Sequence, residues 1–321
     1  MAGIPPAKSW REKAAETFGR HLPQFLVSKR AELKPQSFSC VDRFLSVYAQ
    51  PWHGRALDSI DRRVVAIRLS EIAAKHGPGA ANRFRSALSN YFAWLIGAGL
   101  TESNPVTGTN KAPGEGGART RLLDDGELAA IWRAAGSDQF GSIVRLLILT
   151  GARREEIGGL RWSEIDLDRA VILLPGERTN NSREHLVALS PAAISILEAQ
   201  PRRLDPGGAS RDLIFGHGDR AYSGWSKSRR ELDVRLEAAG TPVLDFVLHD
   251  FRRALSTWLH EAGFPPRVVE RLLGHLQPGV GRVYNAAEYL EERRRALEKW
   301  AGHIEEITTG KPPATVVQLR R

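Results

Sequence analysis

Residues 143–157 read IVRLLILTGARREEI, an apolar run followed directly by a charged turn. The run Ile143–Leu149 favours a buried helix, Gly151 favours its end, and Arg153 favours the start of a new turn. Glu156 stands three residues after Arg153, so its carboxylate can fix the guanidinium plane for bidentate binding of a phosphate. The same spacing also fits a purely structural ion pair at a helix start.

A second charged segment begins at residue 248 and reads LHDFRRALS. On a helical wheel, His249 and Arg252 share one face with Ser256. The opposite face is apolar and consists of Phe251, Leu255, Trp258, Leu259 and Ala262. A histidine and an arginine one turn apart form a compact two-donor site suited to an oxyanion. Solvated polar positions on an amphipathic helix are the alternative.

A third segment, residues 265–275, reads PPRVVERLLGH and predicts a short helix opened by proline and stopped by glycine. His275 then lies just past the helix end. Tyr284 follows nine residues later, and Tyr289 five residues after that. Either tyrosine, taken alone, is equally well explained as a residue at the edge of the core with its hydroxyl in water.

The chain of 321 residues is about twice the usual size of one domain, which favours two domains. Residues 103–118 contain two prolines and four glycines, the composition of a linker. Apolar spacing predicts helices over Asp61–His76 and Gly79–Ala98 upstream of it. Downstream, helices are interrupted by a β-hairpin made of Ala170–Pro175 and His185–Leu189. We expect a helical domain over 1–102, the linker 103–118, a mainly helical domain with a small sheet over 119–307, and a mobile tail over 308–321.

The net charge of +9 is unevenly distributed along the chain. Residues 1–117 hold 16 basic and 9 acidic side chains, whereas the rest of the chain is nearly balanced. A basic excess on one domain indicates a polyanionic partner, most commonly nucleic acid, although a solvated basic surface would look the same. The candidate contacts in the first domain are Arg62, Arg63, Arg83 and Arg85.

Several classes are excluded by composition. Apolar runs are too short to span a membrane, and the first ten residues lack the apolar core of a secretory signal. Cys40 is the single cysteine, so a disulfide scaffold or a thiolate zinc finger cannot form. We therefore expect a cytoplasmic protein with no membrane partner.

Together the motifs resemble the tyrosine recombinase (phage integrase) family. The resemblance rests on TGxRxxE at 150–156, HxxR at 249–252, LGH at 273–275 and a tyrosine nine residues later, and it spans about residues 118–305. Residues 283–301, VYNAAEYLEERRRALEKWA, further resemble integrases of prophages and genomic islands. The basic first domain resembles the family's core-binding domain, which implies a mainly α, two-domain clamp with a mostly helical α/β catalytic domain.

The resemblance implies site-specific cutting and rejoining of DNA. Tyr284 would form a 3′-phosphotyrosyl link, Arg153 and Arg252 would clamp the phosphate, His275 would donate to it, and His249 would act in acid/base roles. Glu156 would support Arg153, and no metal or cofactor is needed. Double-stranded DNA with attachment-type sites is the implied partner, bound by a protein that is monomeric in solution and tetrameric on paired sites.

One position departs from the family pattern, because the hairpin of the family carries a catalytic lysine that protonates the leaving 5′-oxygen. Here the stretch from Arg178 to Arg183 reads RTNNSR, with Asn180 in that place. Asn180 cannot supply a proton, so Arg178 or Arg183 would have to substitute electrostatically or contact DNA. Lys227 is the only lysine between Lys111 and Lys299. It could serve only if the fold brought it to the phosphate.

Three functions remain open at this point. The first is an active integrase, and the second is a DNA-binding protein of the same fold with weakened or lost cleavage. A type IB topoisomerase shares the tyrosine chemistry and is the third, but it would not assemble tetramers on paired sites.

The spacing predicts that Tyr284, and not Tyr289, is the nucleophile. Tyr284→Phe removes one oxygen and little packing, so covalent protein–DNA adducts should disappear in this variant and persist in Tyr289→Phe. Adduct formation on a nicked DNA substrate is the measurement. The opposite pattern in the two variants would reassign the nucleophile.

Overall fold

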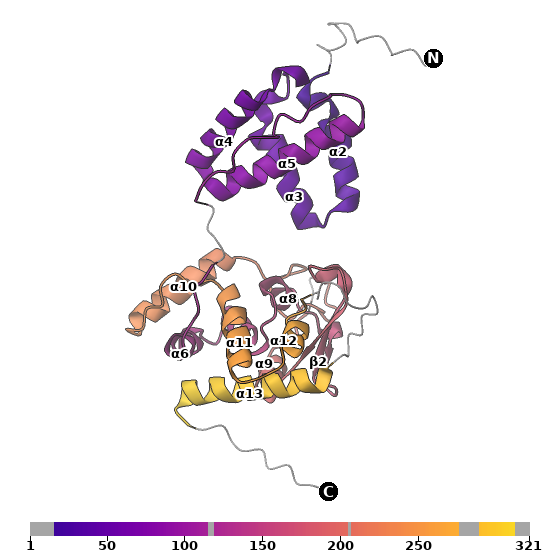
Figure 1. Ribbon diagram of the computed structural model, residues 1–321. Helices are drawn as coiled ribbons and strands as arrows, with labels where there is room; N and C mark the ends of the chain where they lie inside the picture. Colours follow the sequence, from indigo (N-terminus) through magenta and orange to yellow (C-terminus); the bar gives the residue numbers. More distant parts are fainter. Residues whose placement is uncertain (1–15, 115–118, 205–206, 276–288, 312–321) are drawn as a thin grey trace. The chain divides into compact units, whose positions relative to one another are not determined.

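The computed structural model describes residues 16–114, 119–204, 207–275 and 289–311. The chain forms two compact units, Met1–Arg119 and Thr120–Arg321, here called unit 1 and unit 2 (Figure 1). Each unit has a hydrophobic core of its own. Within the described ranges, no helix combines the length and the apolar character needed to cross a membrane.

Unit 1 is helical, and both of its predicted helices are confirmed. They are α4 (Arg62–His76), capped by the Asp61 side chain, and α5 (Pro78–Gly97). The remaining elements of the unit are α2 (Phe18–Glu32), α3 (Pro35–Arg43), and the short turns η1 (Phe44–Tyr48), η2 (Gln50–Trp52) and η3 (Leu57–Ser59). The buried Tyr91 hydroxyl donates to the Phe18 carbonyl at 2.7 Å and joins α5 to the start of α2. Burial raises the pKa of Tyr91, so this hydroxyl stays protonated.

The segment expected to be a linker is attached to α5 over much of its length. Asn104 Nδ2 donates to the Ser89 carbonyl at 3.1 Å, and the Ala112 N–H donates to Asn82 Oδ1 at 2.8 Å. Val106 is fully buried in the core of unit 1. Proline and glycine content predicted an absence of regular structure, but it could not reveal these tertiary contacts. The expected linker spanned 103–118, but these contacts attach residues 104–112 to unit 1.

Unit 2 is mostly helical with one small sheet, which confirms the expected fold class. Its helices are α6 (Asp125–Ala134), α7 (Gln139–Thr150), α8 (Arg154–Gly158), α9 (Pro191–Glu198), α10 (Trp225–Ala238), α11 (His249–Glu261), α12 (Pro266–Leu272) and α13 (Leu290–Thr309), with short turns η4 (Trp162–Glu164) and η5 (Gly176–Arg178). Asp124 and Glu127 form a capping box that starts α6 as the acidic run predicted.

The sheet contains three antiparallel strands in the order β1-β2-β3. The predicted hairpin is confirmed as β2 (Val171–Leu174) and β3 (His185–Ala188), with Leu174 opposite His185. The strand β1 (Ile165–Asp166) pairs with β2 and was not predicted, since two residues carry no readable period. All four β3 residues are buried, so this strand lies inside the unit.

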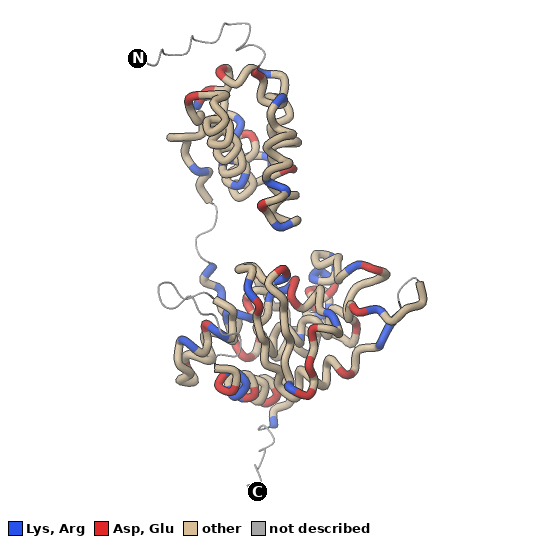
Figure 2. Tube along the Cα trace, turned by 90° about the vertical axis from the view of Figure 1, so that its right-hand side faces the viewer, with Lys and Arg blue, Asp and Glu red and all other residues tan. Residues whose placement is uncertain are grey.

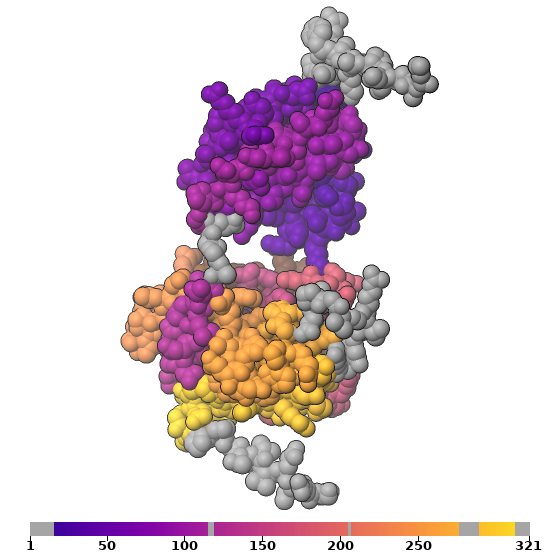
Figure 3. Space-filling view, in the orientation of Figure 1, coloured from indigo at the N-terminus to yellow at the C-terminus, as the bar shows by residue number. Residues whose placement is uncertain are grey.

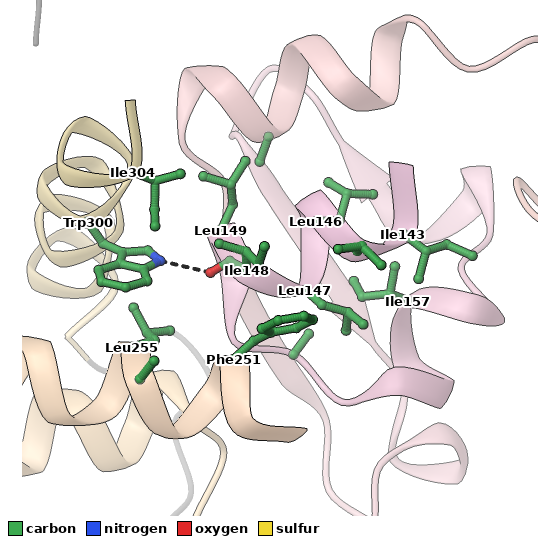
Figure 4. Packing of buried hydrophobic residues seen from close by; sticks show 14 of the residues in the cluster. Ile143, Leu146, Leu147, Ile148, Leu149, Ile157, Phe251, Leu255, Trp300 and Ile304 are labelled. Atoms are coloured by element: carbon green, nitrogen blue, oxygen red, sulfur yellow. Dashed lines mark hydrogen bonds between the residues drawn. The ribbon is translucent and has the colours of Figure 1, made fainter. Parts of the chain in front are cut away.

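Helix α7 forms the centre of the core of unit 2, in agreement with its largely apolar sequence. Ile143, Leu146, Leu147, Ile148 and Leu149 are at most 1% exposed. Figure 4 shows them packed against side chains of α11 and α13. The buried Trp300 indole N–H from α13 donates to the Ile148 carbonyl at 2.8 Å, so the two helices are also joined by a hydrogen bond (Figure 4).

Helix α13 is visible along one edge of unit 2 in the space-filling view (Figure 3). It continues to Thr309, two residues into the segment expected to be a mobile tail, and residues 312–321 lie outside the described part. Basic and acidic residues are interspersed along the backbone trace of unit 2 (Figure 2). This mixture agrees with the near balance of charge in the second part of the sequence.

Candidate active site

The first arginine of the site follows a sharp turn at the end of α7. Gly151 has φ +62°, which strains other residues, and a Cβ atom there would lie only 2.4 Å from Leu255 Cδ2, so any side chain would also force Leu255 to move. Arg153 then donates from its backbone N–H to Glu156 Oε2 at 2.7 Å and from Nη1 to Oε1 at 2.9 Å. The predicted ion pair is therefore present, and because Glu156 is buried it fixes the guanidinium at the start of α8.

Arg252 is buried in α11, with 5% of its surface exposed. Its Nη1 donates to the Gly151 carbonyl at 2.8 Å, and its Nη2 donates to the Leu273 carbonyl and contacts His275 Nε2 at 3.0 Å. Burial and the nearby positive charge of Arg153 lower the pKa of Arg252 to about 10, which leaves it charged at neutral pH. The alternative of a solvated polar position is therefore wrong for this residue.

His275 lies just beyond α12, as predicted. Its Nδ1 lies 2.7 Å from Glu270 Oε2, and its Nε2 faces Arg252. A guanidinium can only donate, so Nε2 accepts from Arg252 and the imidazole proton on Nδ1 is donated to Glu270. Glu270 therefore orients this ring, a role that sequence reasoning missed although the carboxylate stands five residues upstream.

His249 lies at the first position of α11, on the exposed rim of a pocket of about 490 Å³. Partial desolvation of the ring, followed by the positive charges of Arg252 and Arg153, lowers the pKa of His249. The neutral imidazole is favoured, and a neutral imidazole can accept a proton. Arg153, Glu156 and Asn180 line the same pocket. A larger hollow of about 830 Å³ elsewhere in unit 2 is lined by none of the predicted site residues.

Asn180 and Asn181 lie at the tip of the hairpin and face different parts of the site. Asn180 is exposed and lines the pocket with Arg153. Asn181 Nδ2 donates to the Gly274 carbonyl at 3.2 Å, which ties the hairpin to the turn before His275. Lys227 is 79% exposed in its side chain and lines a different pocket, on α10. The fold therefore places Asn180, and not Lys227, beside Arg153.

Arg178 was expected to contact DNA or to replace the missing lysine, but its guanidinium is held by contacts within unit 2. It forms an ion pair with the buried Glu164 and donates from Nη2 to the Glu156 carbonyl at 2.8 Å. These contacts join the hairpin to α8. Arg183 is exposed on the loop before β3.

The arginines of unit 1 are not equivalent either. Arg62, Arg63 and Arg83 are exposed. Arg85 is partly buried and donates to the Thr109 hydroxyl and carbonyl at 2.9 and 3.1 Å. Arg85 thus anchors the segment after α5.

Tyr284 lies outside the described residues. Tyr289 is the N-cap of α13 with φ +56°, and the Arg267 guanidinium lies 5.6 Å from the centre of its ring. Tyr289 thus lies directly before a helix whose first turn is acidic.

His185, which sequence reasoning treated only as part of a strand, lies beneath the site. It is 4% exposed, and its Nδ1 is buried without a hydrogen-bond partner in the structure. Burial lowers the pKa of His185 to about 4. The negative charge of Glu156 opposes this shift, and the positive charges of Arg293, Arg252 and Arg153 add to it, each by a smaller amount. A histidine that opens a β-favouring run was the only available signal.

Comparison with known proteins identifies the fold family. A model of the phage integrase family matches residues 127–291, about half of the chain, and the chain belongs to this family. The chain is 29% identical over 264 residues to prophage integrase IntZ of Escherichia coli K12, and 34% identical over 164 residues to prophage integrase IntA of the same strain. These matches cover 78% and 51% of the chain, but only 63% and 38% of the relatives.

Solved structures agree with this assignment at the level of fold. A lambda integrase (residues 75–356) dimer bound to a COC′ core site superposes with a TM-score of 0.61 at 18% identity, covering 84% of this chain and 99% of that one. The Tn1549 transposon integrase in complex with circular intermediate DNA reaches a TM-score of 0.63 at 14% identity, covering 86% and 99%.

The depressed pKa of His185 predicts a specific dependence of stability on pH. Folded His185 stays neutral down to about pH 4, whereas the unfolded chain takes up this proton near pH 6.5. The unfolded state binds more protons in this window, so the free energy of unfolding falls as pH drops from 6.5 towards 4. His185→Phe should flatten that slope by up to about 1.4 kcal/mol per pH unit.

Chemical denaturation of the whole chain at several pH values measures this slope. Substitution of the exposed His260 on α11 is the control. An identical slope in the parent and His185→Phe would show that His185 is already protonated in the folded protein.

Proposed function

We propose that this protein is a site-specific DNA recombinase that cuts and rejoins DNA through a 3′-phosphotyrosyl intermediate, acting in the cytoplasm. The observation that carries the proposal is the joining of Arg153, Arg252 and His275 at one place, next to the pocket that His249 lines. Two fixed guanidiniums and an oriented imidazole suit the charge that develops on a phosphate during transfer. Family membership and the names of IntZ and IntA support the same activity.

In the proposed reaction, the Tyr284 phenolic oxygen attacks the phosphorus atom of one DNA strand. A Tyr–O–P bond forms, and the tyrosine proton passes to a base for which neutral His249 is suited. The bond from phosphorus to the 5′-oxygen breaks, and this oxygen takes a proton from water to become a 5′-hydroxyl. Arg153 and Arg252 bind the non-bridging oxygens. Once the phosphate has taken the Arg252 N–H, Nε2 of His275 takes up a proton from solvent and donates it in a hydrogen bond to the same group, while Nδ1–H stays on Glu270.

The intermediate keeps the energy of the broken phosphodiester. A 5′-hydroxyl from a partner strand can attack it, release Tyr284 and restore a phosphodiester in a different duplex. One bond of this type replaces another, so the exchange needs no metal or cofactor.

DNA would be held by both units. The basic excess of residues 1–117, with Arg62, Arg63 and Arg83 exposed on helical surfaces, supports contact with phosphates by unit 1. In unit 2, Arg183 is suited to the same task. A monomer that assembles as a tetramer on paired sites fits this scheme, and one solved relative is a lambda integrase tetramer bound to a Holliday junction.

Asn180 favours a second candidate, a DNA-binding protein of the same fold that cleaves weakly. It lines the pocket beside Arg153, and no lysine is among the described residues of that lining. Arg178, which could compensate, is engaged with Glu164 and the backbone of α8. Loss of a general acid typically lowers a rate by about 10² to 10⁴.

Covalent capture distinguishes the two candidates. DNA bound to the protein in cells is recovered and sequenced, and a duplex of that sequence is nicked next to the cleavage point so that the released strand diffuses away. A recombinase accumulates a covalent adduct on this substrate, with Tyr284→Phe as the negative control. DNA binding without an adduct in the parent protein would favour the second candidate.

Asn180→Lys should raise cleavage of an ordinary phosphodiester by roughly 100-fold, because it returns a proton donor to the leaving 5′-oxygen. The first-order rate of adduct formation at saturating DNA is the measurement. Ser182→Lys, which adds the same charge two residues further along the hairpin, is the matched control for a general gain in affinity.

A substrate with sulfur at the bridging 5′ position has a leaving group that needs no proton. The parent and Asn180→Lys should therefore cleave it about equally. An unchanged rate on ordinary DNA, in a parent that already cleaves rapidly, would mean that another group already serves the leaving oxygen.

A further inference from the structure

The imidazole ring of His185 is packed directly against Gly274. A Cβ atom added to Gly274 would lie 3.2 Å from His185 Cε1 and 3.3 Å from both ring nitrogens. His185 opens β3, while Gly274 belongs to the turn after α12, so two distant parts of the sequence meet here. A side chain at position 274 would press against the ring, which would have to give way by a few tenths of an ångström.

The turn that contains Gly274 carries two groups of the proposed active site. The preceding carbonyl, of Leu273, accepts from Arg252, and the following residue, His275, contacts Arg252 through Nε2 at 3.0 Å. The Gly274 carbonyl itself accepts from Asn181. The backbone of the turn is thus held by hydrogen bonds on both sides of Gly274, and the His185 ring supports it from within the unit.

The surroundings of His185 favour an uncharged ring at this place. The charged groups that face it are Glu156 of α8, Arg293 of α13, Arg252 of α11 and Arg153. Three are positive and one is negative, so a protonated His185 would add a buried positive charge to an excess of positive charge. A neutral ring can support the turn without repelling the two site arginines.

We propose that His185 is a positioning residue, whose ring packs beneath Gly274 and sets the place of His275 relative to Arg252. The expected effect on catalysis rests on the proposed recombinase function. The packing of His185 and its effect on the position of His275 do not depend on that function. His185 contacts neither DNA nor the reacting atoms in this scheme. It acts only through the turn.

The chain offers a matched control for a test at the glycine. Gly274 has φ +63° and Gly263, at the end of α11, has φ +82°. Each therefore suffers backbone strain when replaced by alanine. A methyl group at Gly263 meets nothing within 4 Å, whereas a methyl group at Gly274 meets the His185 ring. The difference between the two alanine variants isolates the ring contact.

The experiment compares Gly274→Ala, Gly263→Ala, His185→Ala and the double variant His185→Ala/Gly274→Ala in the full chain. Without DNA, ¹⁵N NMR of labelled histidines reports the tautomer of His275. With the nicked duplex described above, adduct rate at saturating DNA and DNA affinity are measured separately. Thermal melting shows which variants are folded, and His185→Asn replaces His185→Ala if the latter does not fold.

We expect Gly274→Ala and His185→Ala to change the His275 tautomer signals and to lower the adduct rate by about 10- to 100-fold, because small misplacements are costly in catalysis. Affinity should stay within about twofold, since His275 is proposed to act on the charge that develops during transfer and most DNA contacts lie elsewhere. Gly263→Ala should resemble the parent in both measurements. In the double variant the added methyl group occupies space left by the ring, so its effect should be smaller than the sum of the two single effects.

Equal effects of Gly274→Ala and Gly263→Ala, or strictly additive effects in the double variant, would overturn the inference. If even the parent forms no adduct, the proposed function has failed, and the NMR comparison alone decides the inference. His275 signals that are unchanged in Gly274→Ala and His185→Ala would then refute it, and changed signals in both would uphold it.

Discussion

The buried guanidinium of Arg252 is the interaction on which the arrangement of unit 2 depends. It joins three segments, because it donates to the Gly151 carbonyl after α7 and the Leu273 carbonyl after α12 from its own position in α11. A buried cation without such acceptors would be strongly destabilising. The Arg252 guanidinium needs these carbonyl acceptors, so the segments that follow α7 and α12 must lie against it. The same two segments carry Arg153 and His275.

Two glycines make those helix ends possible, each for a steric reason in addition to its positive φ. A side chain at Gly151 would force Leu255 to move, and Gly274 lies against the His185 ring. Close backbone approach at both points lets carbonyl oxygens reach Arg252. The core formed by α7, with Phe251, Leu255 and Trp300, holds the same helices from the apolar side.

Much of this could be predicted from local sequence. The run Ile143–Leu149 indicated the central buried helix, proline and glycine bounded α12, and two β-favouring apolar runs indicated the hairpin. The i+3 spacing of Arg153 and Glu156 indicated their ion pair. Predictions that depended on tertiary contacts fared less well, as the segment after α5 and the environments of Arg85 and Arg178 illustrate.

The sequence by itself determined the order and spacing of the motifs and the elements on which they lie, because periodicity and helix-end signals are properties of neighbouring residues. Tertiary structure alone decided which groups share an environment. The contact of Arg252 with Gly151 spans 101 residues, and that of Arg178 with the Glu156 carbonyl spans 22. Burial, charge proximity and the low pKa of His185 arise from segments far apart in the chain, so no local pattern encodes them.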